Sequence, residues 1–182
     1  GLLILMSSTT ILGQEESAEE SSGILEEIVV TASRRGGTDI TITPVSMTAI
    51  TGTDIERYSS RDLRDIALMV PNLSAATVSA FNSASFAMRG VAETTIILYK
   101  EAPVGVVIDD FFIPHLQTQN LEMFDIEQIE VLRGPQGTLF GKNTTAGVIT
   151  IRTKKPEMDS SYADIKFEVG DFGRNDLEFA LN

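Results

Sequence analysis

The chain has 182 residues, is 42% apolar and carries a formal net charge of -12. The apolar content excludes a wholly disordered chain and is enough for one ordinary domain with a core. The excess of acidic residues repels phosphate, so binding to a nucleic-acid backbone is not expected. The absence of cysteine excludes disulfide frameworks, thiol nucleophiles and thiolate metal sites.

The first 13 residues contain the apolar run Leu2–Met6, followed by small polar residues and then by acidic ones. This order resembles the back part of a secretory signal peptide, without an initiator Met or a basic front. We therefore expect residues 1–13 to be a partial signal peptide of an incomplete reading frame, cleaved near Gly13. A disordered tail with a chance apolar patch is the alternative. No later segment has the roughly 18 to 20 apolar residues of a membrane helix, so membrane contact would need another architecture.

Residues 14–42 are predicted to be a flexible N-terminal segment. Gln14–Gly23 is acidic and free of aromatic residues, so it cannot bury enough apolar surface to hold one shape. A short β-prone block follows, consisting of Ile28, Val29, Val30, Thr31 and Ala32. A strand between two solvated segments has few local partners, which favours pairing with a strand from another protein.

The regular spacing of apolar residues predicts a folded domain over residues 43–157. Thr53–Glu56 has the order of a capping box, and apolar residues at helical spacing from Leu63 to Val70 predict a second helix that ends before Pro71. Asn120–Phe124 is predicted as a helical turn. The predicted strands are 45–50, 73–78, 86–91, 105–110, 127–132 and 147–153. This mixture indicates an α+β fold with helices to one side of a sheet.

Residues 158–182 have a different pattern, in which apolar and charged residues alternate twice around a turn at 170–175. Ala163, Ile165, Phe167 and Val169 fall on one face of the first segment, and Leu177, Phe179 and Leu181 fall on one face of the second. The pattern suits the wall of a transmembrane β-barrel, with lipid outside and a polar lumen inside. A hairpin in a soluble antiparallel sheet is the alternative.

The most informative block is Ile126–Pro156, which reads IEQIEVLRGPQGTLFGKNTTAGVITIRTKKP. It resembles the plug domain of TonB-dependent outer-membrane receptors over some thirty residues. Further matches follow the same order along the chain: IVVTA at 28–32, LRD at 63–65, VPNLS at 70–74, MRG at 88–90 and VIDD at 107–110. The glycine-rich turn also resembles a phosphate-binding loop, but Gln136 and Asn143 stand where that motif needs Gly and Ser or Thr.

The resemblance implies an α+β plug domain, with a small mixed sheet and short flanking helices, followed by the first antiparallel strands of a transmembrane β-barrel. It implies an outer-membrane receptor of a Gram-negative bacterium that takes up a scarce ligand, such as a ferric siderophore, and is not an enzyme. Residues 28–32 would be the TonB box, which adds a strand to the periplasmic domain of TonB. Arg89 and Arg133, each followed by Gly, would face glutamates of the barrel wall. Outer-membrane lipid would contact the barrel, and a monomer is expected.

Three loop-like regions are candidates for ligand contact: 79–85, 93–102 and 111–119. Their candidate residues are Phe81, Asn82, Tyr99, Phe111 and Phe112, the aromatic ones expected to be exposed. The single His115 has no His or Cys nearby, so neither a metal site nor a cofactor is expected.

Two other function classes stay open. The first is an isolated plug-like module that binds a ligand or partner without transport. The second is a periplasmic hydrolase that uses carboxylates such as Asp109, Asp110, Glu127 and Glu130, although nothing in the sequence brings these together with a nucleophile.

Overall fold

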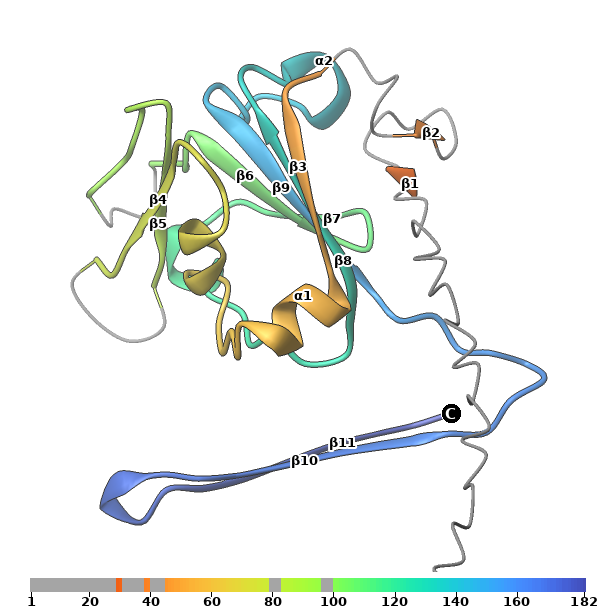
Figure 1. Ribbon diagram of the computed structural model, residues 1–182. Coiled ribbons are helices and arrows are strands. Elements are labelled where there is room, and N and C mark those ends of the chain that lie inside the picture. Colours follow the sequence, from red (N-terminus) through yellow and green to blue (C-terminus); the bar gives the residue numbers. More distant parts are fainter. Residues whose placement is uncertain (1–28, 31–37, 40–44, 79–82, 96–99) are drawn as a thin grey trace, which may run out of the picture.

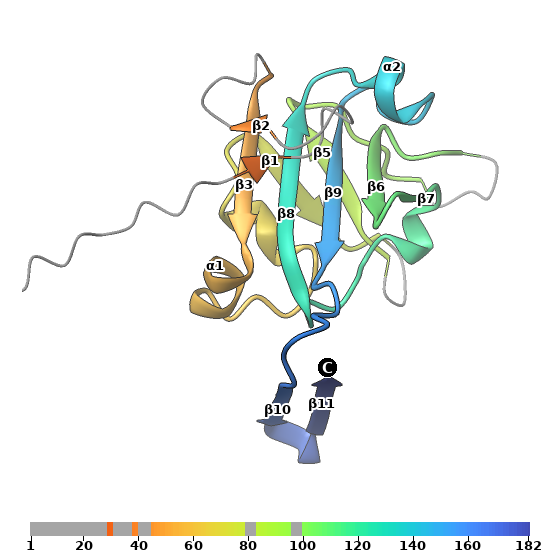
Figure 2. The same cartoon turned by 90° about the vertical axis from the view of Figure 1, so that its right-hand side faces the viewer.

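The computed structural model describes residues 29–30, 38–39, 45–78, 83–95 and 100–182. Its centre is a five-stranded mixed sheet with the strand order β3-β8-β9-β6-β7 (Figures 1 and 2). The strands are β3 (Met47–Thr51), β8 (Ile126–Arg133), β9 (Gly147–Thr153), β6 (Val104–Ile108) and β7 (Phe111–Ile113). Only the β6–β9 pair is parallel among these neighbours.

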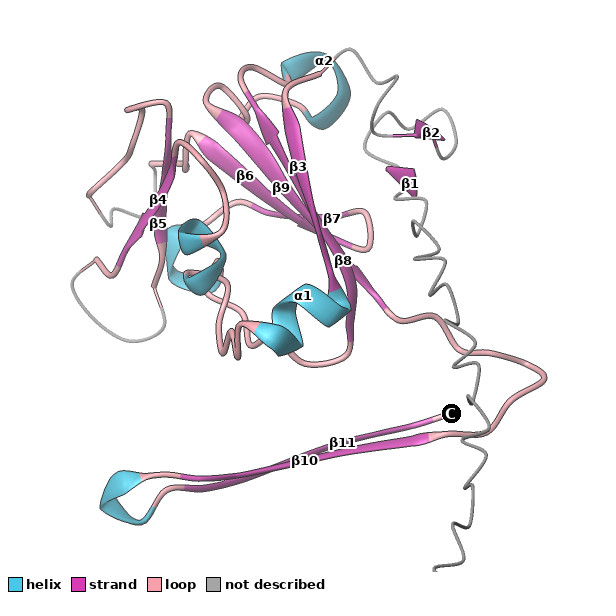
Figure 3. Cartoon of the chain, in the orientation of Figure 1, coloured by secondary structure: helices cyan, strands magenta, loops and turns pink. Residues whose placement is uncertain are grey.

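One face of the sheet carries the main core. Side chains at alternate positions of β8 and β9, such as Ile129 and Ile149, are fully buried on this face. A layer of short elements covers them (Figure 3). These elements are α1 (Gly52–Arg57), the 3-10 helix η1 (Asp65–Leu68), β4 (Leu73–Ala76) and β5 (Ser85–Met88). The predicted α+β layering is therefore present.

The opposite face of the sheet has a smaller apolar cluster. Val107, Leu132 and Val148 are buried there, and Phe112 and Phe140 pack against them. Phe140 belongs to α2 (Gly137–Phe140), the single helical turn inside the glycine-rich segment. We expected all helices to lie on one side of the sheet. The turn α2 is the exception, because it lies on the other side.

Several predicted elements differ from the structure. The capping box that starts α1 uses Thr51 and Asp54, not Thr53 and Glu56. The predicted helix from Leu63 to Val70 is only the turn η1, because the backbone on either side pairs with other segments. The predicted helical turn Asn120–Phe124 is wrong for the same reason, since the N–H of Leu63 donates to the carbonyl of Leu121. A short 3-10 helix, η2 (Leu116–Thr118), lies just before it.

Residues 163–181 form a separate antiparallel hairpin. Strands β10 (Ala163–Val169) and β11 (Asn175–Leu181) are joined through the 3-10 turn η3 (Asp171–Gly173). In the pairing register Ile165 lies opposite Phe179, and Phe167 lies opposite Leu177. These four side chains are 63–71% exposed, whereas the charged residues between them are half-buried. The hairpin thus presents its apolar face to its surroundings and its charged face inward.

A second small ladder lies near the amino end, where β1 (Val29–Val30) pairs antiparallel with β2 (Thr38–Asp39). The second and third residues of the predicted box, Val29 and Val30, therefore adopt the extended conformation of a strand. Among the described residues, no helix has the length and apolar character needed to cross a membrane.

Candidate functional site

The first Arg-Gly pair occupies a tight turn rather than a strand. Arg89 and Gly90 both have positive φ (53° and 82°), and Met88 and Val91 exchange two backbone hydrogen bonds of 3.0 Å around them. Two successive positive φ values are typical of a two-residue hairpin turn, in which Gly is the least strained residue. The predicted strand 86–91 consequently ends at Met88, and Arg89 is exposed at the tip of the turn.

The second Arg-Gly pair ends β8. The Arg133 guanidinium donates through Nη2 to the carbonyl of Met47 at 3.0 Å and through Nη1 to the carbonyl of Pro71 at 3.4 Å. Its Nε is buried and has no hydrogen-bond partner in the part of the chain that the structure describes. Arg133 therefore joins the start of β3 to Pro71, which follows η1. Its Nε–H is still available to an acceptor.

The two arginines lie next to each other. A Cβ atom built on Gly134 would be 3.2 Å from Nη1 of Arg89, so the Arg89 side chain lies over the backbone that follows Arg133. Gly134 has φ of 106° and fits there because it has no side chain. Within the described ranges, neither guanidinium forms an ion pair with a carboxylate. Two neighbouring positive charges without a carboxylate form a site that favours an anionic partner.

The glycine-rich segment 134–141 closes tightly on itself. Gly141 has φ of 88°, its carbonyl accepts a 2.8 Å hydrogen bond from the Thr144 hydroxyl, and the N–H of Gln136 donates to the carbonyl of Thr144 at 3.0 Å. The N–H groups of Gln136, Leu139, Phe140 and Gly141 all donate to carbonyls of the same segment or of Thr144, so they are not free to donate to a phosphate as in a phosphate-binding loop. The segment accordingly serves as a compact strand connection.

Hydrogen bonds join the three candidate ligand-contact regions to one another. The N–H of Ala84, at the end of the first region, donates to the carbonyl of Leu116 in the third region at 3.1 Å. The hydroxyl of the neighbouring Ser85 donates to the carbonyl of Glu93, which begins the second region. The structure therefore joins the end of the first region to the start of the second and to Leu116, in the middle of the third.

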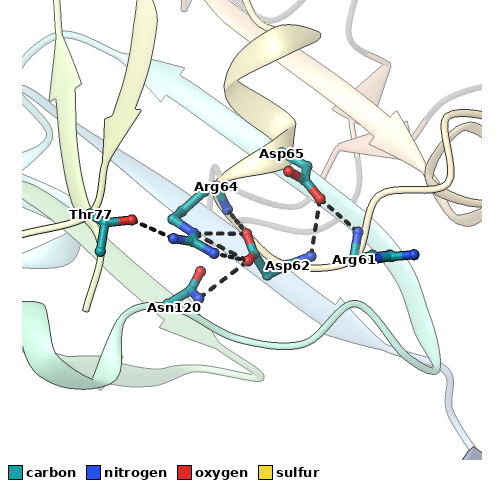
Figure 4. A network of polar contacts seen from close by, with 6 residues as sticks. All are labelled: Arg61, Asp62, Arg64, Asp65, Thr77 and Asn120. Atoms are coloured by element: carbon teal, nitrogen blue, oxygen red, sulfur yellow. Dashed lines mark hydrogen bonds and ion pairs between the residues drawn. The ribbon is translucent and has the colours of Figure 1, made fainter. Parts of the chain in front are cut away.

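A network of charged and polar side chains lies next to the first and third of these regions (Figure 4). Arg64 pairs with Asp62 and also donates to the hydroxyl of Thr77 at 2.5 Å, near the end of β4. Asn120 donates to Asp62 at 3.4 Å from the segment that follows η2. The hydrogen bond from the Arg64 side chain lowers the pKa of the Asp62 carboxyl, and burial opposes this only in part. The network connects the bases of the first and third regions to the loop after α1.

Of the candidate ligand-contact residues, the structure describes only Phe111 and Phe112. Phe81, Asn82 and Tyr99 lie outside the described residues. Phe111 is 79% exposed but sits at the β6–β7 turn, at the end of the sheet away from Ala84. The expected exposure of Phe112 is not found, because this side chain is half-buried against the smaller apolar cluster.

Two other predicted sites are the box at residues 28–32 and His115. In the predicted box, Ile28, Thr31 and Ala32 lie outside the described residues, while Val29 and Val30 form β1. His115 is half-buried, and no group of three metal-ligating side chains occurs in the parts of the chain that were described.

Comparison with known proteins decides the family. The sequence model of the "TonB-dependent Receptor Plug Domain" matches residues 39–148, which is more than half of the chain. The chain belongs to this family. The pesticin receptor of Yersinia enterocolitica is 27% identical over 128 residues, covering 70% of this chain and 18% of that protein. The iron-regulated outer membrane virulence protein of Vibrio cholerae is 30% identical over 129 residues, covering 65% and 18%.

Solved structures give the same result. The ferric yersiniabactin uptake receptor FyuA from Yersinia pestis matches with a TM-score of 0.56 and 26% identity, over 68% of this chain and 18% of that one. This chain thus spans about a fifth of the length of the relatives that it matches. It is a TonB-dependent receptor plug with the start of the barrel, located in the outer membrane of a Gram-negative bacterium, and it is not an enzyme.

The charged network is the feature of this plug that the sequence did not reveal. Asp62 and Asn120 are 58 residues apart, and neither stands in a pattern that predicts their contact. The LRD and VPN matches marked this part of the chain as family-like without indicating that Arg64 bonds to Thr77 and Asp62 to Asn120. The only signal in the sequence was the charge of Asp62 and Arg64 on either side of an apolar residue, Leu63, which the structure buries.

Proposed function

We propose that the full-length protein takes up a scarce ligand across the outer membrane with energy supplied through TonB, and that this ligand is a ferric siderophore. The observation that carries the proposal is the family match together with a hairpin whose apolar face points outward. The names of the relatives support the ligand class, since one is a ferric yersiniabactin uptake receptor and another is an iron-regulated outer-membrane protein.

The proposed division of the chain follows from these features. Residues 14–42 would be the flexible segment with the TonB box, 43–157 the plug, and 158–182 the beginning of the wall. The exposed apolar stripe of β10 and β11 favours this division over an isolated module, because a free hairpin would leave its large apolar side chains in water.

Arg89 and Arg133 are proposed to hold the plug in the barrel through carboxylates of the wall. The support is their adjacency, the unused Nε of Arg133 and the lack of a carboxylate partner among the described residues. A planar guanidinium can bind a carboxylate with two parallel hydrogen bonds, which gives more orientation than a Lys ammonium would.

The ligand is proposed to bind over regions 79–85, 93–102 and 111–119. Their bases are joined by backbone and hydroxyl hydrogen bonds, which would transmit the position of one region to the others. Phe81, Asn82 and Tyr99 remain the candidates for direct contact, with Phe111 and Phe112 as weaker ones because of where they lie. An aromatic side chain on a supported loop offers a large contact area at a small cost in side-chain entropy.

Uptake driven through the TonB box can be tested with one substitution and its control. Val30→Pro removes a backbone donor from the strand that would be added to TonB, whereas Val30→Ala keeps it. In a Gram-negative host that lacks its own siderophore receptors, we expect accumulation of radioactive iron with the unmodified protein and with Val30→Ala, but not with Val30→Pro. An uncoupler of the proton gradient should abolish the uptake.

The ligand class is identified when a panel of ferric siderophores, cobalamin and haem is supplied, with cobalamin followed by radioactive cobalt because it contains no iron. Uptake of none of these by the unmodified protein, despite normal amounts in the outer membrane, would count against the proposal. Equal uptake with Val30→Pro and Val30→Ala would remove the box from the mechanism and leave binding without energy coupling.

A further inference from the structure

The segment that leads from the plug to the hairpin is bonded to the residue that follows β11, at the open end of the hairpin beside the start of β10. The Asn182 side chain accepts a hydrogen bond from the N–H of Glu157 at 2.9 Å and donates to the carbonyls of Glu157 and Ser160 at 2.9 and 2.8 Å. Tyr162 and Asn182 also exchange two backbone hydrogen bonds, of 3.2 and 2.9 Å. A single side chain thus fixes a connection that would otherwise be a free tether.

Two cations of the plug reach the charged face of β10. Lys154 Nζ lies 3.2 Å from an Asp164 carboxylate oxygen, and this contact raises the pKa of the Lys154 ammonium. Arg61, in the loop after α1, places Nε 3.8 Å from a Glu168 carboxylate oxygen. The two contacts are four residues apart on β10, so they define the direction of the strand relative to the plug.

The charges on the two surfaces are complementary. The inward face of the hairpin carries the carboxylates of Asp164, Glu168, Asp176 and Glu178, with the Lys166 ammonium between Glu168 and Glu178 at 3.0 and 3.6 Å. The plug contributes Arg61 and Lys154 to this acidic face. Each exposed pair contributes little alone, but two pairs and the Asn182 contacts together restrict translation and rotation.

We propose that residues 154–182 form a fixed joint, by which the first hairpin of the wall docks on the plug through Arg61 and Lys154. The inference rests on the proposed function, since it takes the hairpin as part of the receptor wall. Its consequence is that the joint keeps its contacts during uptake, so the passage for the ligand opens elsewhere around the plug. The docking surface is separate from the Arg89 and Arg133 pair.

These 182 residues contain no cysteine, so an introduced pair supplies the only thiols of this part of the protein, and any cysteine elsewhere in the full-length protein is first replaced by Ser. In outer membranes that contain the full-length protein, the pair Arg61→Cys with Glu168→Cys is expected to be cross-linked in high yield by a short bifunctional thiol reagent with a reducible disulfide in its spacer, since the 3.8 Å contact joins the ends of two long side chains and not their Cβ atoms. The control pair, Arg61→Cys with Ala180→Cys, places the second thiol at the other end of the same face, opposite Asp164, and should form little. Equal yields for the two pairs would overturn the docking.

The fixed character of the joint is tested by iron uptake before and after cross-linking. We expect uptake to be the same when the Arg61/Glu168 pair is cross-linked and after the cross-link has been reduced. Loss of uptake on cross-linking, with recovery on reduction, would show that the joint must open and would overturn the proposal. If no siderophore is taken up even by the unmodified protein, the proposed function fails, while the cross-linking yields still decide the docking.

Charge reversal gives a second readout that does not depend on transport. Lys154→Glu or Asp164→Lys alone should lower the rate of the Arg61/Glu168 cross-link by about fivefold, within the range of a single exposed pair. The double reversal should restore most of that rate. A double variant as slow as the single ones would show that the pair does not orient the hairpin.

Discussion

The plug body and the β10–β11 hairpin use the same alternating sequence pattern in opposite ways. In β8 and β9 the apolar side chains turn toward a core, and Ile129 and Ile149 have no exposed surface. In the hairpin they turn outward, and Ile165 and Phe179 remain 71% and 66% exposed. Alternation alone therefore predicts a two-faced strand, and the surroundings decide which face is buried.

The difference also separates two sources of stability. The plug body removes its apolar surface from water within its own residues, at roughly 25 cal/mol per Å² buried. The hairpin leaves its apolar side chains uncovered and satisfies its charged ones against the plug. We infer that packing errors will damage the body in any environment, whereas lipid-face changes in the hairpin will matter only in a membrane.

The largest effect is expected where the body is packed most tightly. Gly147 begins β9, and a Cβ there would lie 2.1 Å from Met88 Sδ and 2.4 Å from the carbonyl oxygen of Leu132. Because the Leu132 contact is backbone, Gly147→Ala should lower the free energy of unfolding of the 182-residue chain by about 3 kcal/mol or more. Gly137→Ala is the control, since no atom lies within 4 Å of its added Cβ.

Denaturation by urea, followed by circular dichroism, measures both variants. Unfolding at equal urea concentrations for Gly147→Ala and Gly137→Ala would show that the body is loosely packed without its barrel. That result would contradict the proposed difference between the two regions, because the plug body would then depend on the barrel for its stability as much as the hairpin does.

The next largest effect is expected on the outward face of the hairpin. Phe167 is central in β10 and 63% exposed, so Phe167→Arg should hardly change the chain in water. In the membrane-inserted full-length protein, the same change should cost about 2 kcal/mol, because a cation at mid-depth meets hydrocarbon. Ala180→Arg is the control, since it lies on the inward face opposite Asp164.

Unfolding of the two arginine variants in phospholipid vesicles, read from the heat-modifiable gel mobility of barrels, separates them. Only Phe167→Arg should unfold at lower urea concentration. An equal loss for both variants would mean that the two faces of the hairpin do not differ as proposed.

A smaller, pH-dependent effect is expected from the network around Asp62. Arg64 lowers the pKa of Asp62 below its ordinary 3.8, so the folded state favours the carboxylate. The resulting stability is present above about pH 4 and is lost as pH falls through the lowered value. Asp62→Asn should therefore cost about 1–2 kcal/mol at pH 7 and at pH 5 alike, and progressively less below pH 3.8.

Urea denaturation at a series of pH values checks this window. Asp65→Asn is a useful companion variant, because Asp65 accepts from backbone N–H groups of residues 61 and 62 but does not pair with Arg64. A cost for Asp62→Asn that stays constant from pH 7 to pH 2 would show that the carboxylate charge contributes nothing.

The sequence predicted elements well where local pattern and tertiary packing agree. The bounds of β9 match the predicted 147–153, because the β-branched residues Val148, Ile149 and Ile151 suit a strand with neighbours on both sides. It failed at 120–124, where helical spacing was overridden by backbone bonds from Leu63 and Met123 to distant segments. The position of the Arg89 side chain beside Gly134 was not predicted, since 45 residues separate the two and the resemblance implied only that Arg89 and Arg133 face the barrel wall.

The start of α1 shows how packing selects between two equal local signals. Both Thr51 and Thr53 stand three residues before an acidic residue, so either could cap the helix. The structure uses Thr51, whose hydroxyl accepts from the N–H of Asp54 at 3.3 Å while the Asp54 carboxylate accepts from the N–H of Thr51 at 3.2 Å. Gly52 permits this start because a Cβ there would lie 2.7 Å from the carbonyl oxygen of Ile126.

The smallest effect is accordingly expected at this cap, and it tests whether the body's helices depend on local bonds in addition to the core. Thr51→Ala should lower the free energy of unfolding by about 1 kcal/mol, because the hydrogen bonds of the Thr51 hydroxyl at the helix start are lost. Thr53→Ala, the matched control inside the first turn, should change it by a few tenths of that. Equal costs in urea denaturation, or a larger one for Thr53→Ala, would place the helix start where the sequence pattern first suggested it.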